Sequence, residues 1–160
     1  PESALREMAQ LPPEQLEQLS PLSQSALRRR NSWPDRAAAF AHYRAKSVFA
    51  GFSDDVLWDY VNEGTREKEE GEGVTLAFSP AWEARVYATP PVEVWELIPQ
   101  VTHPTLAIRG AATTTLRPPQ WRRWQRLQPA ATFVEMPGLG HLLPMEAPAA
   151  AADVIRRWLS

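Results

Sequence analysis

The chain has 160 residues, of which 44% are hydrophobic and 22% charged, and its formal net charge is −2 at pH 7. This composition is typical of a globular protein of about one domain and excludes a disordered chain. The near-zero charge gives no electrostatic case for binding nucleic acid or an anionic membrane. The absence of cysteine excludes disulfide scaffolds, thiolate nucleophiles and zinc–thiolate sites. Without an apolar run of ~18 residues or a signal-peptide pattern, we expect a cytoplasmic protein.

Residues 1–98 are predicted to form a mostly helical region that begins with short polar helices over 1–31. Ser32 and Ser53 are N-cap residues, and they predict two antiparallel helices over 34–50 and 53–63. The apolar stripes expected to face inward are Ala37, Ala41, Ala45 and Val48 in the first helix and Val56, Leu57, Tyr60 and Val61 in the second.

The rest of this region is punctuated by charge and by proline. Residues 64–73 contain a run of charges and glycines and are interpreted as a solvated loop. Residues 74–78 are apolar and fit either a strand or the start of a helix. Ser79 and the proline after it predict a further helix, and short helical turns are expected over 94–98.

Residues 99–160 have a different pattern, in which strands and helices alternate. Strands are predicted at 105–108 and 132–136, and helices are predicted from Pro118 and from Pro148. Two strands joined by a helical crossover are parallel, and a parallel sheet needs both of its faces covered. Because two strands cannot form such a sheet alone, the pattern indicates one end of a larger α/β sheet.

Among the three histidines, His141 is the candidate for chemistry. It follows the second strand in a Gly-x-Gly-His loop, at the strand's carboxyl end, where α/β sheets place ligands. A histidine side chain ordinarily titrates near neutral pH, which suits proton transfer. The local pattern alone leaves a structural role for His141 equally open. His42 and His103 are expected to be structural, and Glu146 is interpreted as a partner of the last helix's N-terminal dipole.

The segments PTLAIRG (104–110) and ATFVEMPGLGHLLPMEAP (131–148) resemble the C-terminal part of the α/β-hydrolase fold family. The resemblance implies an α/β fold in which 1–98 is a helical cap-like region and 99–160 is a C-terminal core portion with two parallel strands. It assigns the role of catalytic base to His141. It further implies hydrolysis of an ester or related bond in a small apolar substrate, which Trp58 and Leu142 would contact, with no metal and no cofactor.

Two departures from the family pattern concern the nucleophile and the acid. The nucleophile elbow, G-x-S-x-G, does not occur in this sequence, so a second chain or a missing N-terminal region is expected to carry it. Thr114 is the residue nearest to the position where many members place the acid that orients the histidine. A threonine cannot offset the charge of an imidazolium. Either the acid comes from upstream or the triad is degraded.

Two other functions remain open on the sequence. The first is a non-catalytic interaction protein built on a hydrolase-like remnant, which the missing elbow and Thr114 favour. The second is a self-contained helical module that binds a ligand in a groove formed by the seven tryptophans.

Overall fold

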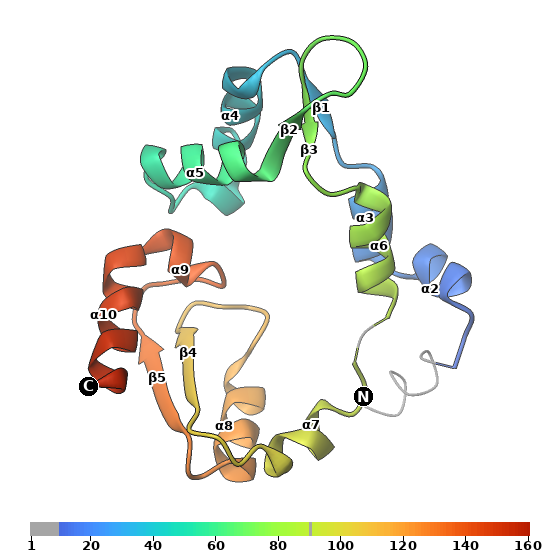
Figure 1. Cartoon of the computed structure of the whole chain (residues 1–160). Coiled ribbons are helices and arrows are strands. Elements are labelled where there is room, and N and C mark those ends of the chain that lie inside the picture. The colour runs from blue at the N-terminus through green and yellow to red at the C-terminus, as the bar shows by residue number, and fades with distance from the viewer. Residues whose placement is uncertain (1–9, 90) are drawn as a thin grey trace. The chain divides into compact units, whose positions relative to one another are not determined.

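The computed structural model describes residues 10–89 and 91–160 (Figure 1). The described chain divides into two compact units, of which the first lies within residues 1–50 and 54–92 and the second comprises 51–53 and 93–160. Among the described residues, no helix is long and apolar enough to cross a lipid bilayer.

The first unit contains short helices and a small antiparallel sheet. Its helices are α2 (Pro13–Leu19), α3 (Pro21–Leu27), α4 (Arg36–Arg44), α5 (Asp54–Gly64) and α6 (Pro80–Ala88), with a 3₁₀ turn η1 at Ser47–Phe49. Its strands are β1 (Ser32–Trp33), β2 (Thr65–Glu67) and β3 (Val74–Leu76), and β3 lies between the other two. The sequence does not predict this sheet, although residues 74–78 fit a strand as well as the start of a helix, and the structure has β3 there.

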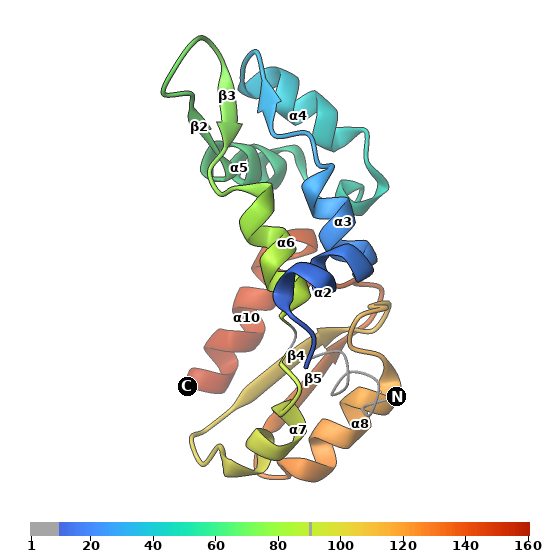
Figure 2. The same ribbon diagram turned by 90° about the vertical axis from the view of Figure 1, so that its right-hand side faces the viewer.

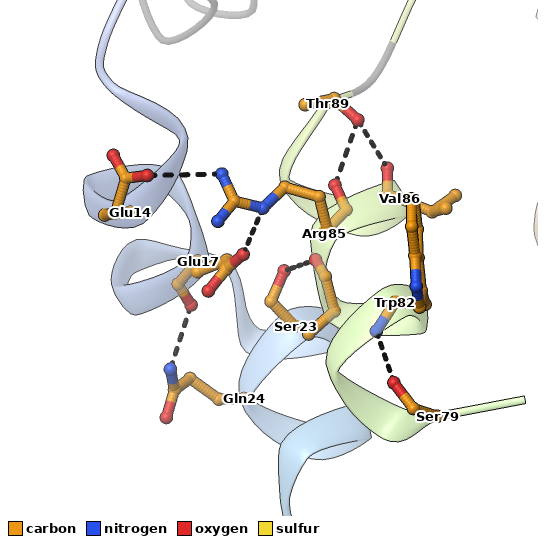
Figure 3. Close-up of polar contacts among 10 residues, drawn as sticks. Glu14, Glu17, Ser23, Gln24, Ser79, Trp82, Arg85, Val86 and Thr89 are labelled. Atoms are coloured by element: carbon orange, nitrogen blue, oxygen red, sulfur yellow. Dashed lines mark hydrogen bonds and ion pairs between the residues drawn. The ribbon is translucent and has the colours of Figure 1, made fainter.

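Helices α3 and α6 lie side by side because small residues line their interface (Figures 1 and 2). The fully buried residues there are Ser23 and Ala26 on α3 and Ala84 and Ala88 on α6. The Ser23 hydroxyl donates a hydrogen bond of 2.8 Å to the carbonyl oxygen of Ala84, so this buried polar group is satisfied (Figure 3). At the α2 end, Arg85 forms an ion pair with Glu17 at 2.7 Å.

The helix predicted over 34–50 ends earlier than expected. Helix α4 stops at Arg44, and the chain continues into the turn η1. Its N-cap is Asp35, whose carboxylate accepts a hydrogen bond of 2.7 Å from the amide of Ala38, instead of Ser32, which lies in β1. The second predicted helix is confirmed as α5, with Leu57 and Val61 fully buried.

The predicted inward face of α4 is wrong. Its expected stripe, Ala37, Ala41, Ala45 and Val48, is exposed. The buried residues of α4 are Ala39 and Tyr43. Tyr43 packs in an aromatic cluster, with ring centroids 5.6 Å from Trp33, 5.1 Å from Phe49 and 5.3 Å from Tyr60. A buried aromatic ring removes far more apolar area from water than an alanine methyl group does, so the aromatic face determines how α4 is oriented.

The second unit contains the parallel strands. Its elements are α7 (Val94–Leu97), a 3₁₀ turn η2 (Ile98–Gln100), β4 (Leu106–Gly110), α8 (Pro118–Leu127), β5 (Thr132–Met136), α9 (Leu143–Glu146) and α10 (Pro148–Leu159). Strands β4 and β5 are parallel, with Ile108 opposite Val134. The predicted strand–helix–strand–helix order and the parallel pairing are confirmed.

Helices α8 and α10 cover opposite faces of this two-stranded sheet (Figure 2). On one face, Trp121 and Trp124 of α8 pack edge-on against Phe133 of β5, with centroids 5.0 and 5.7 Å apart. On the other face, Val134 lines a groove with Trp158 of α10. Successive strand residues point to opposite faces, so the neighbours Phe133 and Val134 separate the two layers.

A cross-strand ion pair lies on the α8 face of the sheet. Arg109 on β4 is 3% exposed, and its Nε lies 3.0 Å from the Glu135 carboxylate on β5. Its guanidinium also lies 5.7 Å from the centroid of the Trp121 ring and donates to the carbonyl of Ala111 at 3.3 Å. The buried guanidinium of Arg109 on β4 therefore contacts groups of β5, α8 and the loop after β4.

Candidate active site

His141 lies in the loop that leaves the carboxyl end of β5, and its side chain is exposed. Its Nδ1 atom lies 3.5 Å from the hydroxyl oxygen of Thr113, which belongs to the loop after β4. Because the two strands are parallel, both loops emerge at the same end of the sheet. The predicted strand–loop–histidine arrangement is therefore present.

Backbone hydrogen bonds join the two loops. The amide of Ala111 donates to the carbonyl oxygen of Met136 at 2.9 Å, and the amide of Ala112 donates to that of Leu139 at 2.9 Å. The turn that begins the second loop places Gly138 at a φ of +74°, a conformation that side chains disfavour. These contacts fix the backbone of the loop that contains His141.

Gly110 ends β4 at the closest approach between the loops. A Cβ atom added to Gly110 would overlap the carbonyl oxygens of Leu139 and Gly140. A side chain at position 110 would therefore push apart the two loops that carry Thr113 and His141.

The residue that approaches the imidazole is Thr113 and not Thr114, which corrects the position assigned from the sequence. Thr113 is buried and also accepts a hydrogen bond of 3.3 Å from the amide of Thr115, whereas Thr114 is exposed. The side chain facing Nδ1 is thus an uncharged hydroxyl. Neither threonine can supply the negative charge that a carboxylate would place there.

The other two histidines have different surroundings. His42 is on α4, with its ring centroid 5.7 Å from that of Trp33. Burial and the charges of Lys46 and Arg30 hold the pKa of His42 below its ordinary value, so the ring stays neutral near pH 7. His103 is exposed in the connection before β4, at the opposite end of the strand from His141.

The predicted substrate contacts, Trp58 and Leu142, belong to different units. Trp58 on α5 is 37% exposed and stacks on Phe40 of α4, with centroids 4.4 Å apart. Leu142 follows His141 directly and is half-buried. Their role in binding substrate stays a prediction.

The most exposed tryptophan is Trp82 on α6, at 71%. Together with Ala81 and Arg85 it lines an open depression on the surface. The sequence does not predict this exposure, because it does not show that α6 packs through the face that carries Ala84 and Ala88.

Within residues 10–89 and 91–160, no group of three His, Asp or Glu side chains is arranged to hold a metal ion.

Comparisons with known proteins identify the fold. The chain is 18% identical to E-2-(acetamidomethylene)succinate hydrolase, with a TM-score of 0.73 over 94% of this chain and 53% of that chain. It is 18% identical to a peroxisomal α/β-hydrolase from Saccharomyces cerevisiae, with a TM-score of 0.69 over 94% and 39% of the two chains. It is 21% identical to a thermophilic esterase from Thermogutta terrifontis, with a TM-score of 0.56 over 93% and 51%.

The chain spans about half the length of the solved structures that it matches, and less in the yeast hydrolase. The predicted fold class, the C-terminal part of an α/β-hydrolase sheet, is confirmed. No protein-family model and no curated protein sequence matches the chain.

Substitution Gly110→Ala should separate the two loops, because its methyl group has no space beside the carbonyl groups of residues 139 and 140. We expect a loss of about 1–3 kcal/mol in the free energy of unfolding, measured by thermal or denaturant unfolding of a protein in which this chain is joined to the strands that complete its sheet. Gly64→Ala is the matched control, since a Cβ there meets nothing within 4 Å. Equal stability of the two variants would contradict the close approach at Gly110.

Proposed function

We propose that this chain carries the helical cap and the catalytic base of an α/β-hydrolase-type enzyme that hydrolyses an ester or related bond in a small apolar substrate. The observation that supports this best is the placement of His141. Its side chain is exposed at the carboxyl end of β5, while its Nδ1 faces Thr113 and its backbone is held against the loop after β4. A histidine held in this way leaves Nε2 available for proton transfer.

In the proposed reaction, a nucleophile from outside this sequence attacks the substrate's carbonyl or equivalent carbon. His141 accepts the nucleophile's proton through Nε2 and later donates it to the leaving group. An oxyanion hole would come from the same region as the nucleophile. The cap-like region would supply apolar side chains that contact the substrate, and Trp58 and Trp82 are exposed there.

A second candidate function is that of a non-catalytic interaction protein on a hydrolase-like scaffold. The observation that favours it is the uncharged Thr113 facing His141. In a Ser-His-Asp triad the carboxylate stabilises the imidazolium, and a hydroxyl does not replace that charge. The two functions differ in whether the complete protein turns over a substrate with His141 as the base.

Substitution His141→Ala in the complete enzyme, meaning this chain together with the sequence that carries the nucleophile, should lower kcat by at least ~10³-fold. This is the scale of general-base catalysis acting as a unit with its nucleophile. The control is His103→Ala, which removes an exposed histidine at the other end of β4 and should leave kcat within about twofold. Activity that survives His141→Ala would contradict the role of His141 as the base, whereas no turnover by the unsubstituted complete protein would favour the non-catalytic function.

Substitution Thr113→Asp should raise kcat in the same enzyme by about tenfold, because a carboxylate beside Nδ1 stabilises the imidazolium that forms in the reaction. Thr114→Asp places the same charge on an exposed residue of the same loop and should have little effect. A lower kcat for a folded Thr113→Asp protein would indicate that the orienting acid comes from elsewhere.

The missing strands are expected to come from the region that carries the nucleophile. Among the described residues, β4 and β5 each pair with one strand only, so the sheet keeps two free edges. Residues 1–160 expressed alone should therefore unfold over a broad temperature range or aggregate, as measured by calorimetry and light scattering. A soluble monomer with a sharp two-state melt would contradict this proposal.

A further inference from the structure

The carboxylate of Glu146 binds the backbone directly before the proposed catalytic base. Glu146 is the last residue of α9, and its Oε2 accepts a hydrogen bond of 2.6 Å from the amide of Gly140. This length is below the usual range of about 2.7–3.2 Å for an N–H···O hydrogen bond, so the two groups are held close together. The amide of Gly140 belongs to the peptide group that joins Leu139 to Gly140, so this bond fixes the orientation of the peptide one residue before His141.

This use of Glu146 differs from the helix-dipole role that its sequence position indicated. Helix α10 begins at Pro148, its N-cap is Ala147, and no side chain caps its first turn. The Glu146 carboxylate turns back to the loop instead, and its other oxygen, Oε1, would lie 2.8 Å from a Cβ added to Gly140.

Gly140 is confined on two sides. On one side its carbonyl oxygen lies where a Cβ on Gly110 would be, and on the other side the Glu146 carboxylate occupies the space of its missing side chain. The peptide before His141 is therefore held between the end of β4 and α9.

The contact between His141 and Thr113 is too weak to fix the ring by itself. Its length of 3.5 Å is at the outer limit of a hydrogen bond, and both partners are uncharged when the imidazole is neutral. The position of the imidazole then depends on the backbone that carries it.

We propose that Glu146 is a positioning residue for catalysis, which acts on His141 through the amide of Gly140. The proposal rests on the proposed function of His141. Glu146 contributes a hydrogen-bond acceptor at a defined position, and its negative charge is not the property that matters.

Three substitutions in the complete enzyme separate geometry from charge. Glu146→Gln keeps an acceptor oxygen at the same reach and should leave kcat within about fivefold. Glu146→Asp keeps the charge but is one methylene shorter, and Glu146→Ala removes the acceptor. Both should lower kcat by about 10²-fold, with KM changed by less than about threefold, because a misplaced base affects the chemical step. A Glu146→Asp enzyme more active than the Glu146→Gln enzyme would overturn the proposal.

The double variant His141→Ala/Glu146→Ala tests whether Glu146 acts through the histidine. Its kcat should equal that of His141→Ala alone, because no base remains to be positioned. A further loss beyond His141→Ala would overturn the proposal, since Glu146 would then act independently.

An NMR measurement distinguishes failure of this proposal from failure of the proposed function. In the ¹⁵N-glycine-labelled enzyme, the Gly140 amide proton should resonate downfield in the unsubstituted and Glu146→Gln proteins and move upfield in Glu146→Asp. Glu146→Asp is used for this measurement because it keeps the charge and the solubility of the protein. It can therefore be measured even if the Glu146→Ala protein does not fold. A Gly140 resonance that does not change in the Glu146→Asp protein overturns the positioning role. If the resonance shifts as expected but the His141→Ala enzyme stays active, only the proposed function of His141 is overturned.

Discussion

The carbonyl groups of Leu139 and Gly140 lie against the Cα of Gly110, and the placement of His141 depends on that approach. Parallel strands bring their two following loops to the same end of a sheet, but they do not by themselves bring the loops into contact. Here the contact is made by backbone groups, through the hydrogen bonds of Ala111 and Ala112. A site built from main-chain contacts tolerates changes in the surrounding side chains and is sensitive to any Cβ atom at the contact.

The first unit has a different physical basis, in which side-chain size decides how the helices are oriented. Between α3 and α6, serine and alanine allow the backbones to come close, and the Ser23 hydroxyl is satisfied by a carbonyl of the neighbouring helix. Around α4, the rings of Trp33, Tyr43, Phe49 and Tyr60 form a cluster that buries one face of the helix. Of the alanines of α4, Ala39 lies on the buried face with Tyr43, whereas Ala37 and Ala41 are exposed.

The sequence predicts well those features that depend on neighbouring residues. Strand β5 is found at the predicted residues 132–136, since its apolar run is bounded by Pro137 and Gly138. The loop that carries His141 follows from the same local pattern. The likeness to solved hydrolases agrees with the fold that the resemblance implied.

Features that depend on distant residues could not be predicted in this way. Strands β1, β2 and β3 have only two or three residues each, and β1 pairs with a strand some forty positions along the chain. The choice of Thr113 over Thr114 depends on the register between two loops, which the contact at Gly110 sets. The hydrogen bond from Gly140 to Glu146 crosses a turn whose path the sequence does not specify.

The hydroxyl of Thr113 has a consequence for the tautomer of His141. A carboxylate only accepts hydrogen bonds, so it would hold the imidazole proton on Nδ1 and keep Nε2 free as a base. A hydroxyl both donates and accepts, so the contact at 3.5 Å is compatible with a proton on either ring nitrogen. In the form with the proton on Nε2, the ring cannot accept a proton from a nucleophile at that atom. A threonine at residue 113 therefore does not select the tautomer that the proposed base requires, whereas a carboxylate there would select it.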